Sequence, residues 1–306
     1  MTSLSLKTWV PSVGLLMLVC VSGACSAGAG EASQRPSGTA NGGATGGGGP
    51  SPSGGSGISV VPGGGAGTQP EDCDASLEVT YRDFSEAHPD FEMAFRGDVV
   101  RRGLVDPTLG GDSKPIFAGS IGCPPLLSSP IACDPTWSVT QPVITSAATF
   151  DQWYRTVAGV NMEYPGKIEL TETPPGSGQY VFESSSFFPL AESEGFGVTP
   201  LGNHMRKNYL FTTEAHVKFG YRAGQRFTFR GDDDMWIFVN GKLAMDLGGM
   251  HGPEERVIDF DAQAAALGIS PGGSYRMDVF HAERHTDGSN FKFTTNIACF
   301  TSQVVR

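Results

Sequence analysis

Short stretches in which apolar and polar residues alternate, separated by Gly and Pro, fill the chain from residue 71 onward. Alternation with a period of two puts every second side chain of a strand on one face, and that face can pack on an apolar core. Residues 235–239 are apolar at every position and therefore predict a central strand that is buried on both faces. Further strands are expected at residues 76–84, 167–171, 179–183, 209–221, 226–230, 257–260, 274–282 and 290–299.

Two short segments favour helices. Residues 150–158 are expected to form one, with Thr149 as its N-cap. Residues 262–267 are expected to form the other, between an N-cap at one of the two preceding Asp residues and a stop at Gly268. Many short strands joined by Gly and Pro turns, with so few helices, are typical of two-layered β-proteins. We therefore predict an all-β, antiparallel sandwich or jelly roll with one or two short helices over residues 71–306.

The first residues have the layout of a secretory signal. Lys7 precedes an apolar stretch at residues 13–21, which is too short to span a bilayer, and small residues follow up to Cys25. A Cys after Gly-Ala is similar to the lipidation site of bacterial lipoproteins, so we predict a signal peptide at residues 1–24 and lipid on Cys25. The protein would then be exported as an outer-membrane or cell-surface lipoprotein. The alternative is ordinary signal cleavage with an incidental cysteine, which would make the protein secreted.

Residues 25–70 predict a disordered linker. They are rich in Gly, Ser and Pro and contain no aromatic residue. Such a segment cannot bury enough apolar surface to offset the entropy lost on ordering. A flexible linker behind a lipidated Cys would hold the domain away from a membrane or wall. The alternative is a low-complexity insertion whose length has no role.

The net charge of the chain argues against two classes of partner. The formal net charge is −11 at pH 7, which argues against nucleic acid and against an anionic lipid surface. No segment reaches the roughly 18 to 20 apolar residues that a membrane-spanning helix needs. Contact with a membrane is therefore expected only through the lipid anchor.

Four of the six cysteines lie in the predicted domain. An even number in an exported chain favours two disulfides, with three possible connectivities. Cys123 and Cys133 flank a short Pro-rich loop and are expected to pair with each other, which leaves Cys73 to pair with Cys299. A metal site is the alternative, but no Cys-x-x-Cys spacing supports it.

Three carboxylates stand together at Asp232, Asp233 and Asp234, directly after Gly231 and before the buried strand. Asp and Gly are common in solvated turns, but three adjacent like charges repel each other. A bound cation would reverse that repulsion, and calcium prefers carboxylate and carbonyl oxygens. Side chains of neighbouring residues on an extended backbone point to opposite faces. Two adjacent Asp residues can therefore share an ion only where the backbone bends sharply, for instance at a cis peptide bond.

The acidic turn lies within the first of two stretches that resemble signatures of the fibro-slime domain family. That stretch is FRGDDDMWIFVNGKLAMDLGGMHG at residues 229–252, and the second is DVFHAERHTDGSNFKF at residues 278–293. Weaker matches occur at residues 82–84, 88–92, 150–161, 187–190 and 208–225, so the resemblance covers most of residues 76–297. The family belongs to the protective-antigen-type β-sandwich superfamily, which includes the flocculin-type lectin adhesins.

The resemblance implies a calcium site that also contacts sugar hydroxyls. In the lectin members, two consecutive Asp residues joined by a cis peptide bond hold the ion, and Asp232 and Asp233 match them. A second loop of those lectins supplies an Asn and backbone carbonyls, which makes Asp287 and Asn290 the remaining candidate ligands. Sugar contacts are then expected from the candidate carbohydrate-binding residues, which are Asp232, Asp233, Asp234, His251 and Asn290. For His251, a hydrogen-bonded place within the loop is the alternative.

The expected function is a calcium-dependent carbohydrate-binding or adhesion module of an extracellular matrix or slime, with a polysaccharide or glycoconjugate as its partner. One alternative is a structural matrix module in which calcium only stabilises the fold. Another is a glycoside hydrolase, which needs two carboxylates at a defined separation that the sequence does not supply. We expect no enzyme. The HAERH segment at residues 281–285 is similar to a zinc-protease motif, but its Glu is displaced and a strand would separate the two His residues by about 13 Å.

Overall fold

The computed structural model describes residues 73–93, 99–126, 129–134, 136, 140–200, 206–286 and 288–305. The predicted signal peptide and the whole predicted linker, which includes Cys25, precede the first described residue, and Asp287 also lies outside the described ranges. Within them, no helix is long and apolar enough to cross a membrane.

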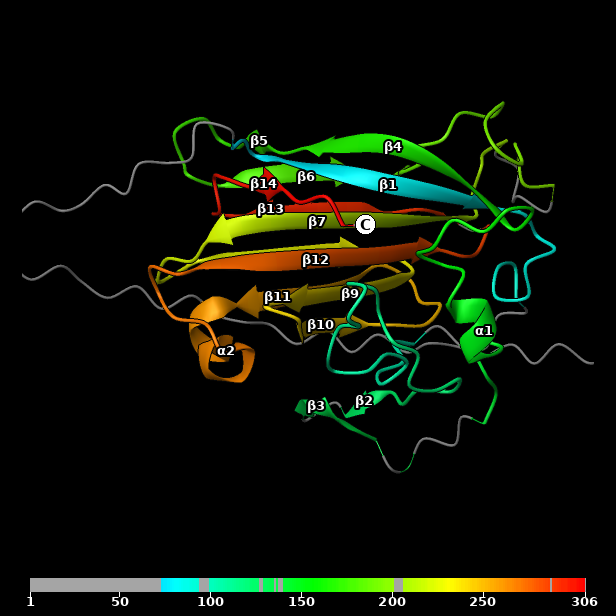
Figure 1. The fold of residues 1–306 in the computed structure, drawn as a ribbon, viewed down its shortest axis with the longest axis horizontal. Helices are drawn as coiled ribbons and strands as arrows, with labels where there is room; N and C mark the ends of the chain where they lie inside the picture. The colour runs from blue at the N-terminus through cyan, green and yellow to red at the C-terminus, as the bar shows by residue number, and fades with distance from the viewer. Residues whose placement is uncertain are drawn as a thin grey trace, which may run out of the picture. The chain divides into compact units, whose positions relative to one another are not determined.

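Two antiparallel sheets form the two layers of the domain (Figure 1). The first has the strand order β10-β9-β12-β7-β1-β4, with β14 also paired to β7. Its strands are β1 (Ser76–Phe84), β4 (Asn161–Glu169), β7 (Phe211–Gly220), β9 (Asp234–Val239), β10 (Lys242–Leu247), β12 (Ser274–Glu283) and β14 (Thr301–Ser302). The second has the order β11-β8-β13-β6-β5. Its strands are β5 (Thr171–Glu172), β6 (Tyr180–Ser184), β8 (Arg226–Gly231), β11 (Glu254–Asp259) and β13 (Phe291–Thr295). A small ribbon pairs β2 (Pro125–Leu126) with β3 (Ser129–Cys133). The predicted all-β sandwich is confirmed.

The first sheet is covered on both faces. Its inner face meets the second sheet in an apolar core, to which β8 and β13 contribute alternate Phe residues such as Phe229 and Phe291. A second core lies on its outer face, where Trp236 packs against Trp153 and Phe280 packs against Tyr154. Every residue of β9 is consequently buried, as the apolar run at residues 235–239 predicts.

The first helix differs from the prediction. The helix α1 spans Ala147–Phe150, and the residues that follow it form turns instead of the expected helix at residues 150–158. Its N-cap is Ser146, because the Ser146 hydroxyl accepts from the Thr149 amide while the Thr149 hydroxyl accepts from the Ser146 amide. Thr149 is therefore the third residue of the helix, where its side chain completes the capping box, and it is not the expected N-cap.

The second helix is confirmed with an earlier start. The helix α2 spans Phe260–Leu267, capped by Asp259, whose side chain accepts from the Ala262 amide. Gly268 ends it in the left-handed region, with φ 68°, which glycine adopts without a steric penalty. Because Phe260 begins this helix, the expected strand at residues 257–260 ends one residue earlier, and β11 extends from Glu254 to Asp259.

Both expected disulfides are present. Cys73 pairs with Cys299 across a Cα–Cα distance of 5.2 Å, and Cys123 pairs with Cys133 across 5.4 Å. The first disulfide joins the residue before the β1 region to the segment after β13, so it ties the two ends of the domain together. Disulfides persist in oxidising compartments, which agrees with an extracellular or surface location.

A buried network of charges lies on the first sheet. The His216 imidazole donates from Nδ1 to Asp278 over 2.6 Å and from Nε2 to Glu214 over 2.5 Å. Glu214 also pairs with Arg82 over 2.6 Å and with Lys114. Burial lowers the pKa of His216, but its hydrogen bonds to the two carboxylates outweigh burial and raise it overall. Burial alone would raise the pKa of Glu214, yet the His216 hydrogen bond and the two cations bring it to about 2.

This network should make stability depend on pH on both sides of neutrality. The His216 contribution is complete below its ordinary pKa of 6.5 and is lost as the pH rises through the raised value. The Glu214 contribution is complete above 4.5 and is lost as the pH falls toward about 2. In urea unfolding at pH values of about 5.5 and 9, the wild type should lose more stability on going to the higher pH than His216→Gln does. Equal losses in the two proteins would contradict a raised pKa at His216.

Candidate cation and carbohydrate site

Two loops that cross from one sheet to the other meet at one end of the sandwich. Asp232 and Asp233 carry the chain from β8 to β9, and residues 284–290 carry it from β12 to β13. The strands on either side are neighbours, because Asp234 pairs with Ala282 and Gly231 pairs with Phe291. The strand register therefore brings together the two sequence stretches that resemble the fibro-slime signatures.

Asp232 is held by the second loop. Its Oδ1 accepts from the Asn290 amide over 2.6 Å, and its Oδ2 accepts from the Asn290 side chain over 2.9 Å. The two backbones approach so closely that a Cβ at Gly231 would clash with the Asn290 carbonyl oxygen. Burial raises the pKa of Asp232, although the Asn290 hydrogen bonds oppose the rise. The structure thus brings together two of the predicted ligands, Asp232 and Asn290.

Asp233 lies deeper in the same turn and is only 5% exposed. Its carboxylate accepts from the backbone amides of His251 and Arg284, each over 3.1 Å. The peptide bond that joins it to Asp232 is cis, as the resemblance implied. Burial raises the pKa of Asp233 well above its ordinary value, and the neighbouring carboxylates add to the rise while Arg284 opposes it.

Asp234 has a different set of partners. It is fully buried and forms an ion pair with Arg284 over 2.6 Å, while its other oxygen accepts from the Gly249 amide. Arg284 also donates to the carbonyls of Asp90 and Val143 and lies over the Trp153 ring at 4.8 Å. These contacts favour a supporting role for Asp234, and its contact with a sugar stays a prediction.

Glu283 is a residue of the site that the sequence did not assign to it. It is 1% exposed at the end of β12, and its Oε2 has no hydrogen-bond partner. Burial raises its pKa well above the ordinary value, with Asp233 and Asp232 as further causes. The Ser289 hydroxyl lies beside it and opposes the rise, but forms no hydrogen bond of good geometry. Arg284 directly follows Glu283 in the sequence, but the fold pairs its guanidinium with Asp234.

The two histidines near the turn contact backbone carbonyl oxygens. His251 is buried, and its Nδ1 donates to the Gly252 carbonyl over 2.8 Å, while its Nε2 lies 3.3 Å from the Leu247 carbonyl oxygen. His281 is fully buried and donates from Nε2 to the Asp232 carbonyl over 3.0 Å. Burial lowers the pKa of His281 to about 4, so this ring is neutral at physiological pH. A contact of His251 with a ligand stays a prediction.

Several oxygen atoms near the turn are suitable ligands for a hard cation. Among the residues that the structure describes, which exclude Asp287, no three His, Cys, Asp or Glu side chains are grouped as a metal site. The His and Glu residues of the HAERH segment, which are all described, form no such group either. The oxygens near the turn come from Asp232, Asp233, Glu283 and Asn290, and carboxylate and amide oxygens are what calcium prefers. The unpartnered oxygen of Glu283 is the feature that a cation would satisfy.

Comparisons with known proteins give relatives but no family. No family model matches the chain, so membership of the fibro-slime family is not confirmed. The chain is 34% identical to Protein psiD of Dictyostelium discoideum over 225 residues, which are 72% of this chain and 41% of psiD. It is 34% identical to Protein psiC of the same organism over 228 residues, again 72% of this chain and 41% of the relative. The chain thus spans less than half the length of these curated relatives.

One solved structure found by comparison is a PA14 sugar-binding domain from an RTX adhesin. It is 14% identical, with a TM-score of 0.23, and the match covers 33% of this chain and 59% of that one. A TM-score this low supports no conclusion about fold or function.

Proposed function

We propose that this chain is an exported, surface-located carbohydrate-binding module whose acidic turn binds calcium and, through it, a glycan. One observation carries the proposal. The carboxyl groups of Asp232, Asp233 and Glu283 are buried together, and Arg284, the guanidinium that the described residues place beside them, is paired with Asp234. Buried carboxylates that raise one another's pKa are costly without a compensating cation.

The chain's own residues would prepare the site for the ion. Asn290 fixes both oxygens of Asp232, and the amides of His251 and Arg284 fix those of Asp233. Each carboxylate oxygen that accepts one hydrogen bond retains a second lone pair for a cation. When bound, calcium would neutralise the cluster and offer its remaining coordination positions to sugar hydroxyls. Asp287 would be a further ligand in the same loop.

The charge of the protein favours a neutral glycan. The net charge of −11 would repel the carboxylates or sulfates of an acidic polysaccharide. We therefore propose an uncharged extracellular polysaccharide or glycoconjugate, as in an extracellular matrix or slime, as the partner.

Calcium should raise the melting temperature of the protein. At calcium concentrations of about 100 times Kd, binding stabilises the folded state by about 2.7 kcal/mol, which corresponds to a rise of roughly 5 to 10 °C for a domain of this size. Asp233→Asn should remove most of the rise because it deletes a charged ligand. Asp151→Asn, whose side chain is 64% exposed, is the matched control and should keep it. Magnesium should substitute poorly. Melting curves of metal-stripped protein that ignore calcium would contradict the site.

A glycan array with and without chelator tests the binding function itself. Retention that disappears with chelator and in Asp233→Asn is the expected result. Calcium-dependent melting without any glycan retained would favour the structural matrix module instead. Release of free sugar from a polysaccharide would favour the glycoside hydrolase.

A further inference from the structure

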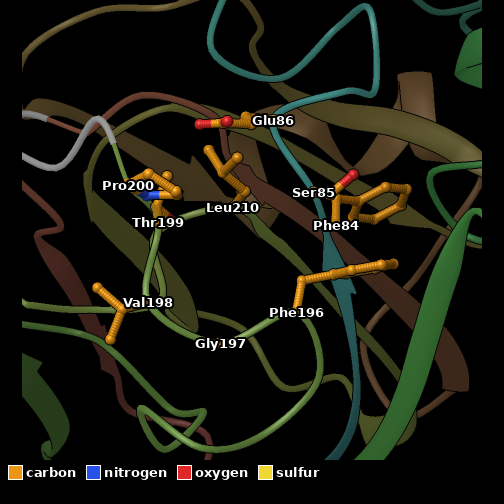
Figure 2. A pocket seen from close by; sticks show the side chains of 9 residues that line it. All are labelled: Phe84, Ser85, Glu86, Phe196, Gly197, Val198, Thr199, Pro200 and Leu210. Atoms are coloured by element: carbon orange, nitrogen blue, oxygen red, sulfur yellow. The ribbon is translucent and has the colours of Figure 1, made fainter.

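A small cavity opens close to the end of the sandwich that holds the acidic turn. Figure 2 shows the side chains that line it, and its volume is about 190 Å³. Phe84 and Leu210, both buried, contribute apolar surface, and Thr199 and Pro200 lie on the side opposite Phe84 and Phe196. Pockets that enclose drug-sized ligands measure roughly 300–1,000 Å³, so this cavity would take one ring-sized group.

The strand order fixes where this cavity lies relative to the acidic turn. Phe84 ends β1 and Leu210 immediately precedes β7, while Glu283 ends β12 and Asp234 begins β9. The strands β9, β12, β7 and β1 are consecutive antiparallel neighbours. These four residues therefore all lie at the same end of the strands of the first sheet. With strands about 4.8 Å apart, the cavity lies two to three strands, or roughly 10 to 14 Å, from the turn.

The segment that forms the outer wall is fixed to the sheets. The Phe196 amide donates to the Asp83 carboxylate, and the Gly195 amide donates to the Tyr164 hydroxyl over 2.7 Å. Gly195 has a φ of 57°, and a Cβ there would clash with Asp83, so this close approach requires glycine. The Thr199 hydroxyl accepts from the Tyr209 amide over 3.2 Å. These hydrogen bonds fix the position of the wall, and Phe196 within it is 41% exposed.

The lining has the chemistry that a neutral sugar ring requires. The exposed ring of Phe196 offers an apolar face, against which the C–H face of a pyranose can stack. Ser85 and Glu86 are polar residues of the same lining. None of the described residues that line the cavity is Lys or Arg, so none of them compensates an anionic ligand.

We propose that this cavity is a second sugar subsite, which binds a further neutral hexose unit of the same glycan chain that the acidic turn holds. The inference rests on the proposed calcium-dependent glycan binding and specifies its ligand class. A single sugar at the turn cannot reach the cavity, whereas a linear oligosaccharide of neutral hexoses can span the distance. The module is thereby selective for glycan chains over monosaccharides.

Calorimetric titration of the calcium-loaded full-length protein tests the subsite. The probes are glucose, mannose and galactose, and the linear tetrasaccharide of each. We expect the wild type to bind the tetrasaccharide of at least one hexose about tenfold more tightly than the monosaccharide. Phe196→Ala should weaken tetrasaccharide binding about five- to tenfold, as expected for the loss of one aromatic stacking contact, and leave monosaccharide binding unchanged. Glu86→Gln should act in the same direction with a smaller effect.

Val257→Ala is the matched control. Val257 is 44% exposed on β11 in the other sheet, and its truncation should change neither affinity. Tetrasaccharide binding that is unaffected by Phe196→Ala, or that is no tighter than monosaccharide binding, would overturn the subsite while leaving calcium-dependent binding at the turn intact. A wild type that binds no probe, or binds with chelator present, would overturn the proposed function and the subsite with it.

Discussion

Replacing Arg284 with methionine should lower the free energy of unfolding by about 3 to 5 kcal/mol, the cost of breaking a buried ion pair from one side. Arg284 and Asp234 are both fully buried, and no other cation contacts the Asp234 carboxylate in the part of the chain that the structure describes. The substitution also removes the donors to the carbonyls of Asp90 and Val143. Urea unfolding of the two proteins measures the difference.

The double variant Asp234→Asn with Arg284→Met provides the control. It removes the carboxylate that the single variant leaves buried and unpaired, so it should be more stable than Arg284→Met alone. A single variant that loses less than about 1 kcal/mol would mean that water or another group solvates Asp234. A double variant no more stable than the single one would show that the packing of Arg284 over Trp153, which both variants lose, outweighs the unpaired charge of Asp234.

Removing the disulfide between Cys73 and Cys299 should cost roughly 5 kcal/mol on the chain-entropy estimate, because the bond closes a loop across a sequence separation of 226. Such a loss is comparable to the total stability of many domains, so the double Ser variant should be largely unfolded at 37 °C. Circular dichroism melting of the variant and the oxidised wild type measures the change.

The second disulfide gives an internal comparison. Cys123 and Cys133 are separated by only 10 positions, so the same estimate gives roughly 3 kcal/mol for their removal. The order of the two losses is the decisive result. If the short loop proves as important as the long one, stabilisation of the folded state outweighs the entropy of the unfolded chain in this domain.

Strand positions could be predicted because burial on one face imposes a period of two. β1 matches the expected residues 76–84, and the fully apolar run at residues 235–239 lies within β9. β10 was not predicted, since its residues 242–247 mix charged and apolar side chains without clear alternation. Its pairing with β9, which includes an irregularity between Leu243 and Met245, comes from tertiary packing that the sequence does not display.

The misplaced first helix has a related cause. Phe150, Trp153 and Tyr154 are spaced three and four apart, which favours one face of a helix. In the structure this spacing reflects burial, because all three side chains pack in the core on the outer face of the first sheet. The hydrogen-bonded helix lies earlier, where Ser146 and Thr149 cap each other. Apolar spacing alone does not distinguish a helix from successive turns against a sheet.

From the residue types alone, the candidate site was predictable only in its most local part, whereas the partnership of Asp232 with Asn290 and the cis peptide bond were expected from the family resemblance. Three consecutive carboxylates are visible in the sequence, and so is their place before a buried strand. The role of Glu283 is not visible, because its proximity to Asp233 depends on two loops crossing between the sheets. Its neighbour Arg284 also offers an apparent partner in the sequence, while the fold gives that guanidinium to Asp234.

The bond between Cys73 and Cys299 also determines how the domain would respond to mechanical force. A pull arriving through the chain before Cys73 meets the disulfide just before β1 begins. The tension is then divided between β1 in the first sheet and the segment that leads back to β13 in the second sheet. Peeling β1 away from β4 and β7 would therefore require the opposite layer to shear as well. If the module is tethered at this end and holds a glycan at its acidic turn, as proposed above, it would bear tension without losing its first strand.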